Sequence, residues 1–165
     1  MHQPPPVGQV GDLPTGSPPG SSSTTLARVD QPSFDASFAV IEPLRAAMGL
    51  TFERMDADGI DASWSAGQES HQPYGVVHGG VHCMVVEGLC SMAAALWLAE
   101  NGQSEGRVVG VHNSTDFYRA VSEGRLTSEC RPVHRGRSQQ VWTVETTDAE
   151  DRLVARGQVR LQNLR

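Results

Sequence analysis

The sequence is poor in apolar residues and carries no excess of positive charge. Hydrophobic residues make up 38% of its 165 residues, whereas globular domains hold roughly 45–50% on a similar count. The deficit lies in the N-terminal segment, so the rest of the chain can still bury a core of ordinary size. The formal net charge is −6, which disfavours nucleic-acid binding because phosphate neutralisation needs clustered Lys and Arg. An anionic ligand stays compatible with this charge if the positive residues are concentrated locally.

Cysteine is scarce as well. The cysteines are Cys83, Cys90 and Cys130, an odd number without close spacing, which argues against a disulfide framework. No apolar run follows a basic start near Met1, so we find no signal peptide. The longest mostly apolar stretch, Val81–Ala99, is interrupted by polar residues and makes a poor membrane span. These absences predict a soluble protein in a reducing, cytoplasmic environment.

Residues 1–32 differ in composition from the rest of the chain. They are rich in Pro, Gly, Ser and Thr and hold few large apolar residues. Such a segment cannot bury enough surface to offset its ordering entropy, so we predict a disordered tail. It is either a docking tail or a solvated extension, and the second is the simpler interpretation because composition alone names no partner. Residues 33–165 are predicted to form one domain.

Hydrophobic periodicity and turn-forming residues divide this domain into elements. We expect an amphipathic helix over Phe34–Met48, which Pro43 can kink or end, and a long helix over about Gly79–Glu100. Strands are expected on both sides of the loop Gly67–Val77, over Thr51–Asp56, Ile60–Ala66, Arg107–Tyr118, Arg125–Val133, Gln139–Thr147 and Leu153–Leu161. The long helix is apolar around most of its circumference, which predicts that it is buried. Consecutive strands at short spacing indicate an antiparallel sheet. The predicted fold class is therefore α+β, with this sheet curled around one central helix.

One acidic residue, Glu87, lies in the middle of the long apolar helix. No other acid occurs between Val81 and Ala99, and the helix holds no Lys or Arg to pair with it. At about 100° per residue, Ser91 is its polar neighbour on the same face. A buried carboxylate is costly unless it is paired or hydrogen-bonded. Glu87 is therefore either a functional carboxylate or a structural residue that is partly exposed or paired with a distant Arg, and spacing alone weighs the two equally.

The helix is preceded by His78-Gly79-Gly80. Two glycines let the backbone approach a ligand closely, and the free N–H groups at a helix start favour negative charge. This suits a developing oxyanion, such as that of a thioester carbonyl under attack. An ordinary tight turn is the alternative for Gly-Gly alone, and Glu87 two turns later is what favours the functional interpretation.

A metal site deserves consideration because His78 and His82 are four residues apart, with Cys83 and Glu87 nearby. The sequence lacks the H-E-x-x-H arrangement, and no second Cys/His cluster completes a ligand set. We therefore expect no metal, and we expect Cys83 and Cys90 to be core residues.

Positive charge is concentrated in one block, Arg131-Pro-Val-His134-Arg135-Gly136-Arg137. The block is either a solvated hairpin tip, which is common, or a phosphate site, because Arg binds phosphate in a bidentate manner. Coenzyme A carries such phosphates. Trp142 and Trp64 are expected in the core, and Trp97 is expected in the core or at an interface.

A long segment and several later blocks together form a family pattern. The segment is Ser70-His-Gln-Pro-Tyr-Gly-Val-Val-His-Gly-Gly-Val-His-Cys-Met-Val-Val-Glu-Gly-Leu-Cys-Ser-Met-Ala-Ala94, and the blocks are Val108-Val-Gly110, Arg119-Ala-Val-Ser-Glu-Gly124, Arg131–Arg137 and Ala155-Arg-Gly-Gln-Val-Arg160. They resemble the hotdog-fold acyl-CoA thioesterases of the PaaI-like type. This type is allied to the Arthrobacter-type 4-hydroxybenzoyl-CoA thioesterases and the enterobactin-pathway proofreading thioesterase. The resemblance covers about Phe34–Leu164, and its specific part is H-G-G-x6-E with its flanks.

The resemblance implies a hotdog subunit whose antiparallel sheet wraps a long helix. It also implies a homodimer or homotetramer with acyl-CoA sites at the dimer interface. We expect no cofactor. Glu87 matches the catalytic carboxylate, as nucleophile or as general base for water, and Gly79 matches the backbone donor that polarises the thioester carbonyl. Gln72 and His78 match residues that position the thioester or the water, and Ser91 matches a hydroxyl that holds the water or the carboxylate. In this family the carbonyl-polarising loop and the carboxylate typically come from opposite subunits.

Two departures from the family pattern bear on the acyl group. Some aryl-CoA relatives have a histidine where this chain reads Phe117-Tyr118, which predicts an acyl pocket less polar than one for a hydroxybenzoyl group. Gly88 replaces a larger residue common beside the catalytic Glu. The site residues expected to bind substrate are Phe117, Tyr118, Arg131, His134, Arg135 and Arg137. The alternatives to a thioesterase are a non-catalytic acyl-CoA-binding hotdog protein and a hotdog hydratase or dehydratase.

Overall fold

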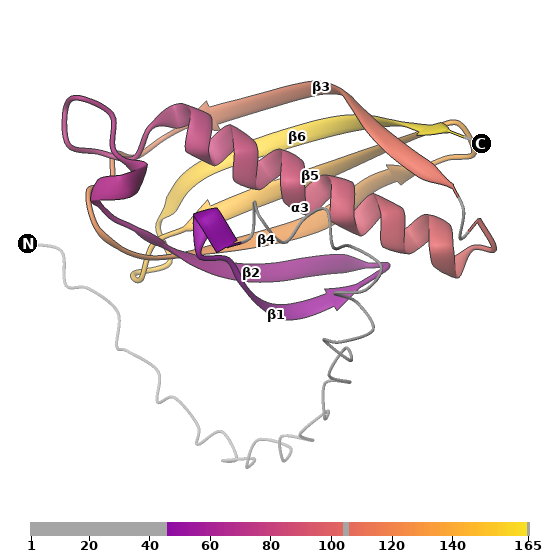
Figure 1. The fold of residues 1–165 in the computed structure, drawn as a ribbon, viewed down its shortest axis with the longest axis horizontal. Helices are drawn as coiled ribbons and strands as arrows, with labels where there is room; N and C mark the ends of the chain where they lie inside the picture. Colours follow the sequence, from indigo (N-terminus) through magenta and orange to yellow (C-terminus); the bar gives the residue numbers. More distant parts are fainter. Residues whose placement is uncertain (1–45, 104–105, 165) are drawn as a thin grey trace, which may run out of the picture.

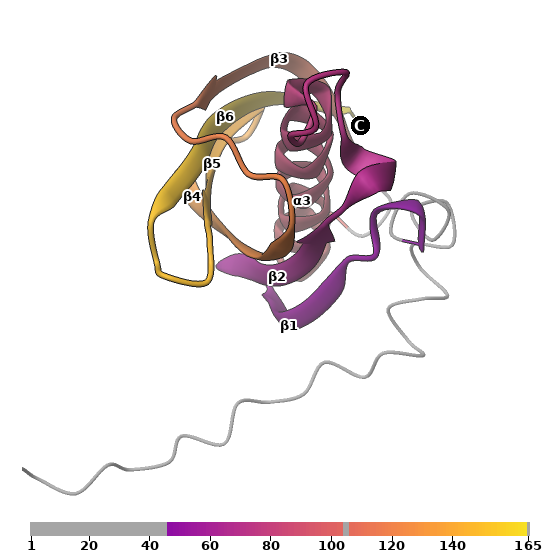
Figure 2. The same ribbon diagram turned by 90° about the vertical axis from the view of Figure 1, so that its left-hand side faces the viewer.

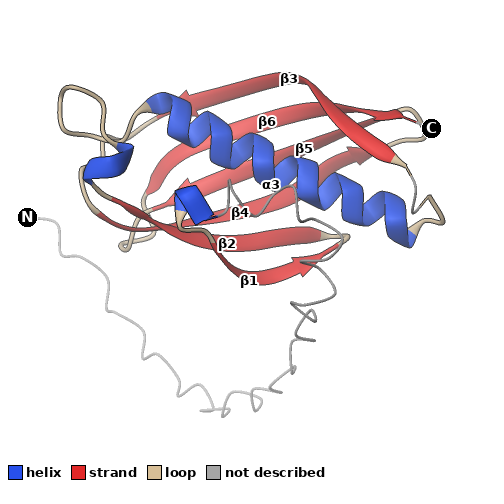
Figure 3. Cartoon of the chain, in the orientation of Figure 1, coloured by secondary structure: helices blue, strands red, loops and turns tan. Residues whose placement is uncertain are grey.

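The computed structural model describes residues 46–103 and 106–164. The predicted tail, residues 1–32, and nearly all of the predicted helix Phe34–Met48 lie outside the described residues. The last three residues of that helix, Ala46–Met48, are helical. The described chain forms one curved sheet with one long helix against it (Figures 1 and 3).

Six strands form a single sheet in the order β1-β2-β4-β5-β6-β3, and every neighbouring pair is antiparallel. The strands are β1 (Thr51–Asp56), β2 (Gly59–Ala66), β3 (Arg107–Phe117), β4 (Gly124–Arg135), β5 (Gln139–Thr147) and β6 (Leu153–Leu164). Helix α3 (Gly79–Glu100) connects β2 to β3, which lie on opposite sides of the sheet. The connection therefore carries α3 across the concave face, and the sheet curls around it (Figure 2). This confirms the predicted α+β architecture.

The core lies between α3 and the concave face of the sheet. Strands β5 and β6 alternate buried and exposed residues, as period-two strands with one covered face do. Leu89 and Met92 of α3 are buried, as is Trp142 of β5. Trp64 of β2 is 2% exposed, and its indole N–H donates to the Ser128 hydroxyl at 3.1 Å. Trp142 and Trp64 are thus core residues, as predicted.

The sequence overestimates the burial of α3. Within the single chain Met84 is 38% exposed, and Glu87, Gly88 and Ser91 are half-buried. One face of the helix is therefore open in the monomer, and the prediction of burial on all sides is wrong for the isolated chain. By length and composition α3 could also cross a membrane, but half of its most apolar window is buried inside the fold. Packing against the sheet accounts for the apolar composition.

Strand bounds follow the predictions except where pairing extends them and at β3, which ends at Phe117, one residue before its predicted end. β6 continues to Leu164, three residues beyond its predicted end, because Leu164 pairs with Arg107 of β3. β4 is longer than predicted at both ends. The predicted loop after β2 contains the short 3₁₀ helix η1 (Gln68–Ser70).

Two glycines let α3 lie close to the sheet. A Cβ built on Gly157 of β6 would come within 2.6 Å of both Val86 Cγ1 and Thr115 Oγ1. A Cβ on Gly110 of β3 would come within 2.9 Å of Glu87 Oε1. At Gly157 the neighbours are core atoms, and at Gly110 the neighbour is the end of the acidic side chain. The second close approach places Glu87 against the edge strand β3.

Candidate active site

Backbone hydrogen bonds fix the residues that lead into α3. The Val77 N–H donates to the Val121 carbonyl at 2.8 Å, and the His78 N–H donates to the Ser70 carbonyl at 2.8 Å. His78 caps the helix because its Nδ1 accepts the N–H of Gly80 at 2.8 Å. No acceptor among the described residues takes the Gly79 N–H. A free donor therefore lies at the positive end of the helix, where it can bind developing negative charge.

The ring of Phe117 lies against this helix start. A Cβ built on Gly79 would come within 2.8 Å of Phe117 Cε2, so the close approach requires glycine there. Phe117 is 53% exposed, and the next residue, Tyr118, is 56% exposed. The structure thus brings Phe117, predicted to bind the acyl group, next to Gly79, predicted to bind the thioester carbonyl.

The carboxylate of Glu87 is held in one conformation by a neighbour on its own helix. The Ser91 hydroxyl donates to Glu87 Oε1 at 2.7 Å, as their spacing of four residues predicts. None of the ion pairs formed by the described residues includes Glu87. The alternative of a Glu paired with a distant Arg is therefore wrong for the described chain. Glu87 is therefore half-buried, oriented by Ser91, and without an ion-pair partner among the described residues.

Gly79 and Glu87 of one chain are too far apart to act on the same atom. They are eight residues apart in one helix, which corresponds to about 12 Å along the helix axis. The carbonyl carbon of a thioester lies within about 3–3.5 Å of its attacking group in a reactive complex. A site that uses both residues therefore needs one of them from a second chain.

His82 lies one turn into α3 and faces the core. It is 4% exposed, and its Nδ1 has no hydrogen-bond partner within the described part of the chain. Its ring meets Trp64 edge-on at 5.5 Å between centroids and lies 5.8 Å from the ring of Phe117. Burial lowers the pKa of His82 below its usual value, so the ring is neutral at neutral pH.

Gln72 belongs to a tight loop beside the helix start. Its N–H donates to the Val76 carbonyl at 2.8 Å, and its carbonyl accepts the Gly75 N–H at 2.9 Å. The His71 ring bonds to the Ser122 carbonyl and joins this loop to the segment after β3. Tyr74, at 88%, is the most exposed of the large hydrophobic residues described. The backbone of Gln72 is thus fixed within its loop, whereas the catalytic role of Gln72 stays a prediction.

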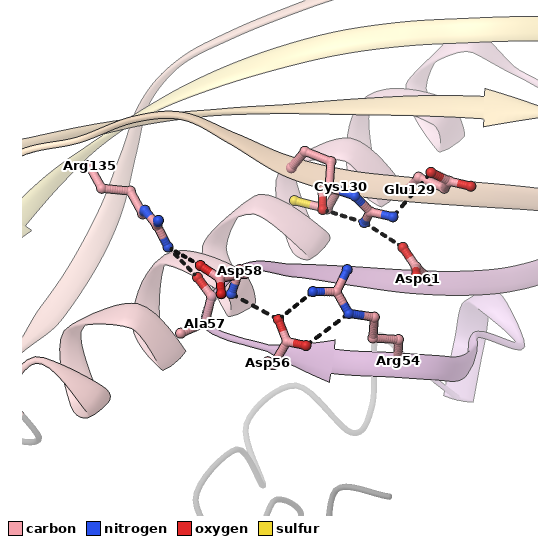
Figure 4. A network of polar contacts seen from close by, with 9 residues as sticks. Arg54, Asp56, Ala57, Asp58, Asp61, Glu129, Cys130 and Arg135 are labelled. Carbon is pink, nitrogen blue, oxygen red and sulfur yellow. Dashed lines mark hydrogen bonds and ion pairs between the residues drawn. The ribbon is translucent and has the colours of Figure 1, made fainter. Parts of the chain in front are cut away.

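The arginines of the basic block do not converge on one point. Arg131 pairs with Asp61 and Glu129 on the convex face of the sheet. Arg135 donates to Asp58 at 2.7 Å and to the Ala57 carbonyl at 2.8 Å (Figure 4).

The guanidinium of Arg135 also lies 5.9 Å from the ring centroids of Trp97 and Trp142, on the concave side. Both Arg131 and Arg135 are therefore engaged by protein groups. Arg137 is exposed and forms no ion pair with a described residue, and His134 is exposed on β4. Phosphate binding by this block stays a prediction.

The remaining candidate chemistry is structural. Within residues 46–103 and 106–164 no group of three or more His, Cys, Asp or Glu residues could hold a metal. Cys90 and Cys130 are buried with their sulfurs 4.0 Å apart, and burial raises the pKa of the Cys90 thiol. Cys83 is half-buried and reduced, so it is less of a core residue than predicted.

A pocket of about 370 Å³ lies on the β2 side of α3. Its lining includes Trp64, Val81 and Met84. Glu87, by contrast, lies against Gly110 of β3. This pocket and the carboxylate are therefore on different sides of the helix within one chain.

Two residues beside Glu87 were not predicted as parts of the site. Gly110 supports the carboxylate, and Asn113 donates from its Nδ2 to the Cys83 carbonyl at 3.0 Å. Both residues lie on β3, so their contacts depend on how the edge strand is placed against α3. No local signal in the sequence gives that placement.

Comparison with known proteins agrees with this geometry. The thioesterase superfamily profile matches residues 74–155. The protein named "Putative esterase Rv1847" from Mycobacterium tuberculosis is 48% identical over 136 residues, which are 81% of this chain and 96% of the relative. The proofreading thioesterase EntH of Klebsiella pneumoniae is 36% identical over 107 residues, 65% of this chain and 75% of the relative. The chain therefore belongs to the thioesterase superfamily, and its fold is the hotdog fold.

Solved structures share the fold. The crystal structure of S. sahachiroi AziG is 56% identical, has a TM-score of 0.70, and covers 74% of this chain and 97% of its own. A hypothetical thioesterase from Streptococcus pneumoniae, crystallised with coenzyme A, has a TM-score of 0.66 with 19% identity over 81% of this chain and 95% of its own. The last similarity shows the fold alone.

Proposed function

We propose that the protein is an acyl-CoA thioesterase whose active site is assembled from two subunits. The observation that carries this proposal is the half-buried carboxylate of Glu87, oriented by Ser91 at 2.7 Å and left without a cation among the described residues. The free N–H of Gly79 at the start of the same helix supplies the complementary group. Superfamily membership and the similarity to EntH, a thioesterase by name, support hydrolysis of a thioester.

Strand β3 supports pairing with a second subunit. It is 11 residues long and lies at the edge of the sheet, with β6 on one side and no described strand on the other. An open edge of this length is a template for another strand. When two copies of β3 pair antiparallel about a centre near the middle of the strand, the Gly110 end of one strand lies beside the Phe117 end of the other.

That arrangement brings the two halves of the site together. Glu87 lies against Gly110, and Gly79 lies against Phe117. Pairing two copies of β3 about this centre therefore moves the carboxylate of one subunit toward the helix start of its partner. It also resolves the separation of about 12 Å between Gly79 and Glu87 within one helix.

The chemistry follows from these groups. The thioester carbonyl accepts the Gly79 N–H, and the positive helix end stabilises the oxyanion as it forms. Glu87 takes a proton from water as the water attacks, or attacks the carbonyl carbon itself to give a mixed anhydride. The C–S bond breaks, the thiolate of coenzyme A leaves and takes up a proton, and water supplies the oxygen of the free acid. Ser91 holds Oε1 in either route and leaves Oε2 to act.

Coenzyme A is proposed as the thiol from the complex of the S. pneumoniae thioesterase, which shares this fold. Exposed Arg137 is the arginine of the basic block that can bind a phosphate without breaking an ion pair seen among the described residues. Phe117 and Tyr118 are proposed to line the acyl pocket beside the partner's carboxylate.

The test is thiol release from a panel of acyl- and aryl-CoA thioesters. We expect Glu87→Gln to lower kcat on the best substrate by about 10²–10⁴-fold, the usual contribution of a positioned acid or base. Glu53→Gln, which changes an exposed acid on β1 at the other edge of the sheet, should leave kcat unchanged. Wild-type turnover by Glu87→Gln would refute the proposal. Tight acyl-CoA binding without turnover in the wild type would instead indicate a non-catalytic binding protein.

A further inference from the structure

The seam between α3 and β3 contains a hydrogen bond one turn away from Glu87. Asn113 faces α3, because its partner across the ladder is the buried Val159. Its Nδ2 donates to the Cys83 carbonyl at 3.0 Å. In an α-helix the Cys83 carbonyl also accepts the N–H four residues later, which is that of Glu87. A side chain from the edge strand and the backbone of Glu87 therefore share one acceptor.

The orientation of the Asn113 amide is determined by its neighbours. The Thr115 hydroxyl bonds to Asn113 Oδ1 at 2.7 Å. A carbonyl oxygen cannot donate, so the amide group facing the Cys83 carbonyl must be the nitrogen. Thr115 Oγ1 lies 2.6 Å from where a Cβ on Gly157 would be, so this position on β6 leaves room for the hydroxyl. The chain Thr115–Asn113–Cys83 thus links β3 to the helical turn that carries Glu87.

We propose that Asn113 is a positioning residue for Glu87. It sets the distance between α3 and β3 at the point where the carboxylate lies on Gly110, and through it the reach of the carboxylate across the subunit interface. This inference rests on the proposed function. A displacement of about 1 Å at a reacting group can cost on the order of 10²-fold in rate, so a contact of this kind affects kcat without touching the substrate.

The dimer makes the contact stronger than it is in one chain. Asn113 is exposed in the monomer, where water competes for its amide and a hydrogen bond adds little. In the proposed pairing Asn113 lies next to the centre of the ladder and is shielded by the partner. The hydrogen bond between Asn113 and the Cys83 carbonyl is then protected from water in the assembled dimer.

The experiment is a double-mutant cycle measured by thiol release from the best substrate. Asn113→Leu, of similar size but without a donor, should lower kcat by about tenfold and change KM less than twofold, while the molecule remains a dimer by sizing. In the Glu87→Gln background the same change should have no further effect, because the residue acts through Glu87. Thr115→Val, which removes the hydroxyl that orients the amide, should lower kcat in the same direction by a smaller factor.

The matched control is Ser114→Ala, on the same strand but facing the opposite side of the sheet, which should keep wild-type kcat. An unchanged kcat in both Asn113→Leu and Thr115→Val overturns the inference. So does an equal loss with and without Glu87, because additive effects mean that Asn113 does not act through the carboxylate. If Asn113→Leu fails to fold, Thr115→Val decides alone. Wild-type turnover by Glu87→Gln would instead remove the proposed function, so the two failures are distinguishable.

Discussion

The two edges of the sheet are built differently. β1 is six residues long and carries three charged residues. Both edge strands have one irregular register, between Phe52 and Arg54 in β1 and between Gly110 and His112 in β3. Its charges are paired: Arg54 with Asp56 at 2.8 Å, and Glu53 with Arg125 of β4. β3 is 11 residues long, and no Asp, Glu, Lys or Arg occurs from Val108 to Thr115. Short and charged edges disfavour pairing, whereas long uncharged edges invite it.

The contrast shows where function is concentrated. The half-buried carboxylate of Glu87 and the exposed amide of Asn113 both lie along β3. The free N–H of Gly79 also lies there, beside the Phe117 ring. Groups that are costly or incomplete in one chain thus gather at the edge that a partner can cover, while the β1 edge is complete in itself. Proteins depart from local rules mainly at functional sites.

The largest expected effect on assembly and activity comes from placing a charged residue on β3, as β1 has. Val111 is 48% exposed on β3, and Val111→Asp adds a charge to the edge, which disfavours strand pairing. We expect dissociation to monomers in sizing experiments, together with a loss of thiol release of about 10²-fold or more, because the two halves of the site no longer meet. Thr51→Asp, at an exposed position of β1, is the matched control and should change neither. A fully active monomer would contradict a site shared between subunits.

A smaller effect is expected from closing the space under the carboxylate. Gly110→Ala places a methyl group 2.9 Å from Glu87 Oε1. The end of a flexible side chain can move, so we expect little loss of stability but a fall in kcat of about tenfold from the displaced carboxylate.

Gly157→Ala is the counterpart at a glycine of β6 that contacts Val86 and Thr115 rather than Glu87. There the new methyl group meets Val86 and Thr115 at 2.6 Å, and overpacking of this kind costs about 1–3 kcal/mol of unfolding free energy. Thermal unfolding and thiol release measured on both variants should separate a loss of activity at β3 from a loss of stability at β6. If both variants lose stability and kcat to the same extent, the fall in kcat of Gly110→Ala does not come from a displaced Glu87 carboxylate.

The sequence predicts the fold well because its signals are local. Helix α3 spans Gly79–Glu100, as periodicity and the glycine start indicate, and strands β1 and β5 have the predicted bounds. The extension of β6 to Leu164 was missed because it depends on pairing with Arg107 of β3. The open face of α3 was missed for a related reason: an apolar helix surface has the same sequence whether the sheet or a partner covers it.

The site was predictable where two residues share an element. The bond between Glu87 and Ser91 follows from helical spacing. The arrangement of the basic block was not predictable from the sequence. Arg131 and Arg135 have the same parity on β4 and should therefore face the same side of the sheet. The register of β4 shifts between Pro132 and His134, so Arg131 lies on the convex face and Arg135 on the concave one. A bulge reverses the parity of every residue after it, and nothing in the block marks its position.

The smallest expected effect is on the pH dependence of stability and concerns the buried ring of His82, which lies at neither edge of the sheet. Burial lowers its folded-state pKa, whereas the unfolded chain titrates near 6.5. As the pH falls below about 6.5, the unfolded state takes up a proton that the folded state refuses, so the free energy of unfolding decreases by up to about 1.4 kcal/mol per pH unit. The decrease ends below the folded pKa.

Replacing His82 with Phe removes both this titration and the unpartnered Nδ1. We expect denaturant unfolding between pH 7.5 and 5.5 to show a smaller loss of stability in His82→Phe than in the wild type. His134→Gln, at an exposed histidine of β4, should follow the wild-type slope. Comparing slopes rather than absolute stabilities separates the titration from any change in packing caused by the larger ring. Parallel slopes for His82→Phe and the wild type would show that the ring is protonated as readily in the folded protein as in the unfolded chain, and that the ring nitrogen reaches water or a polar partner.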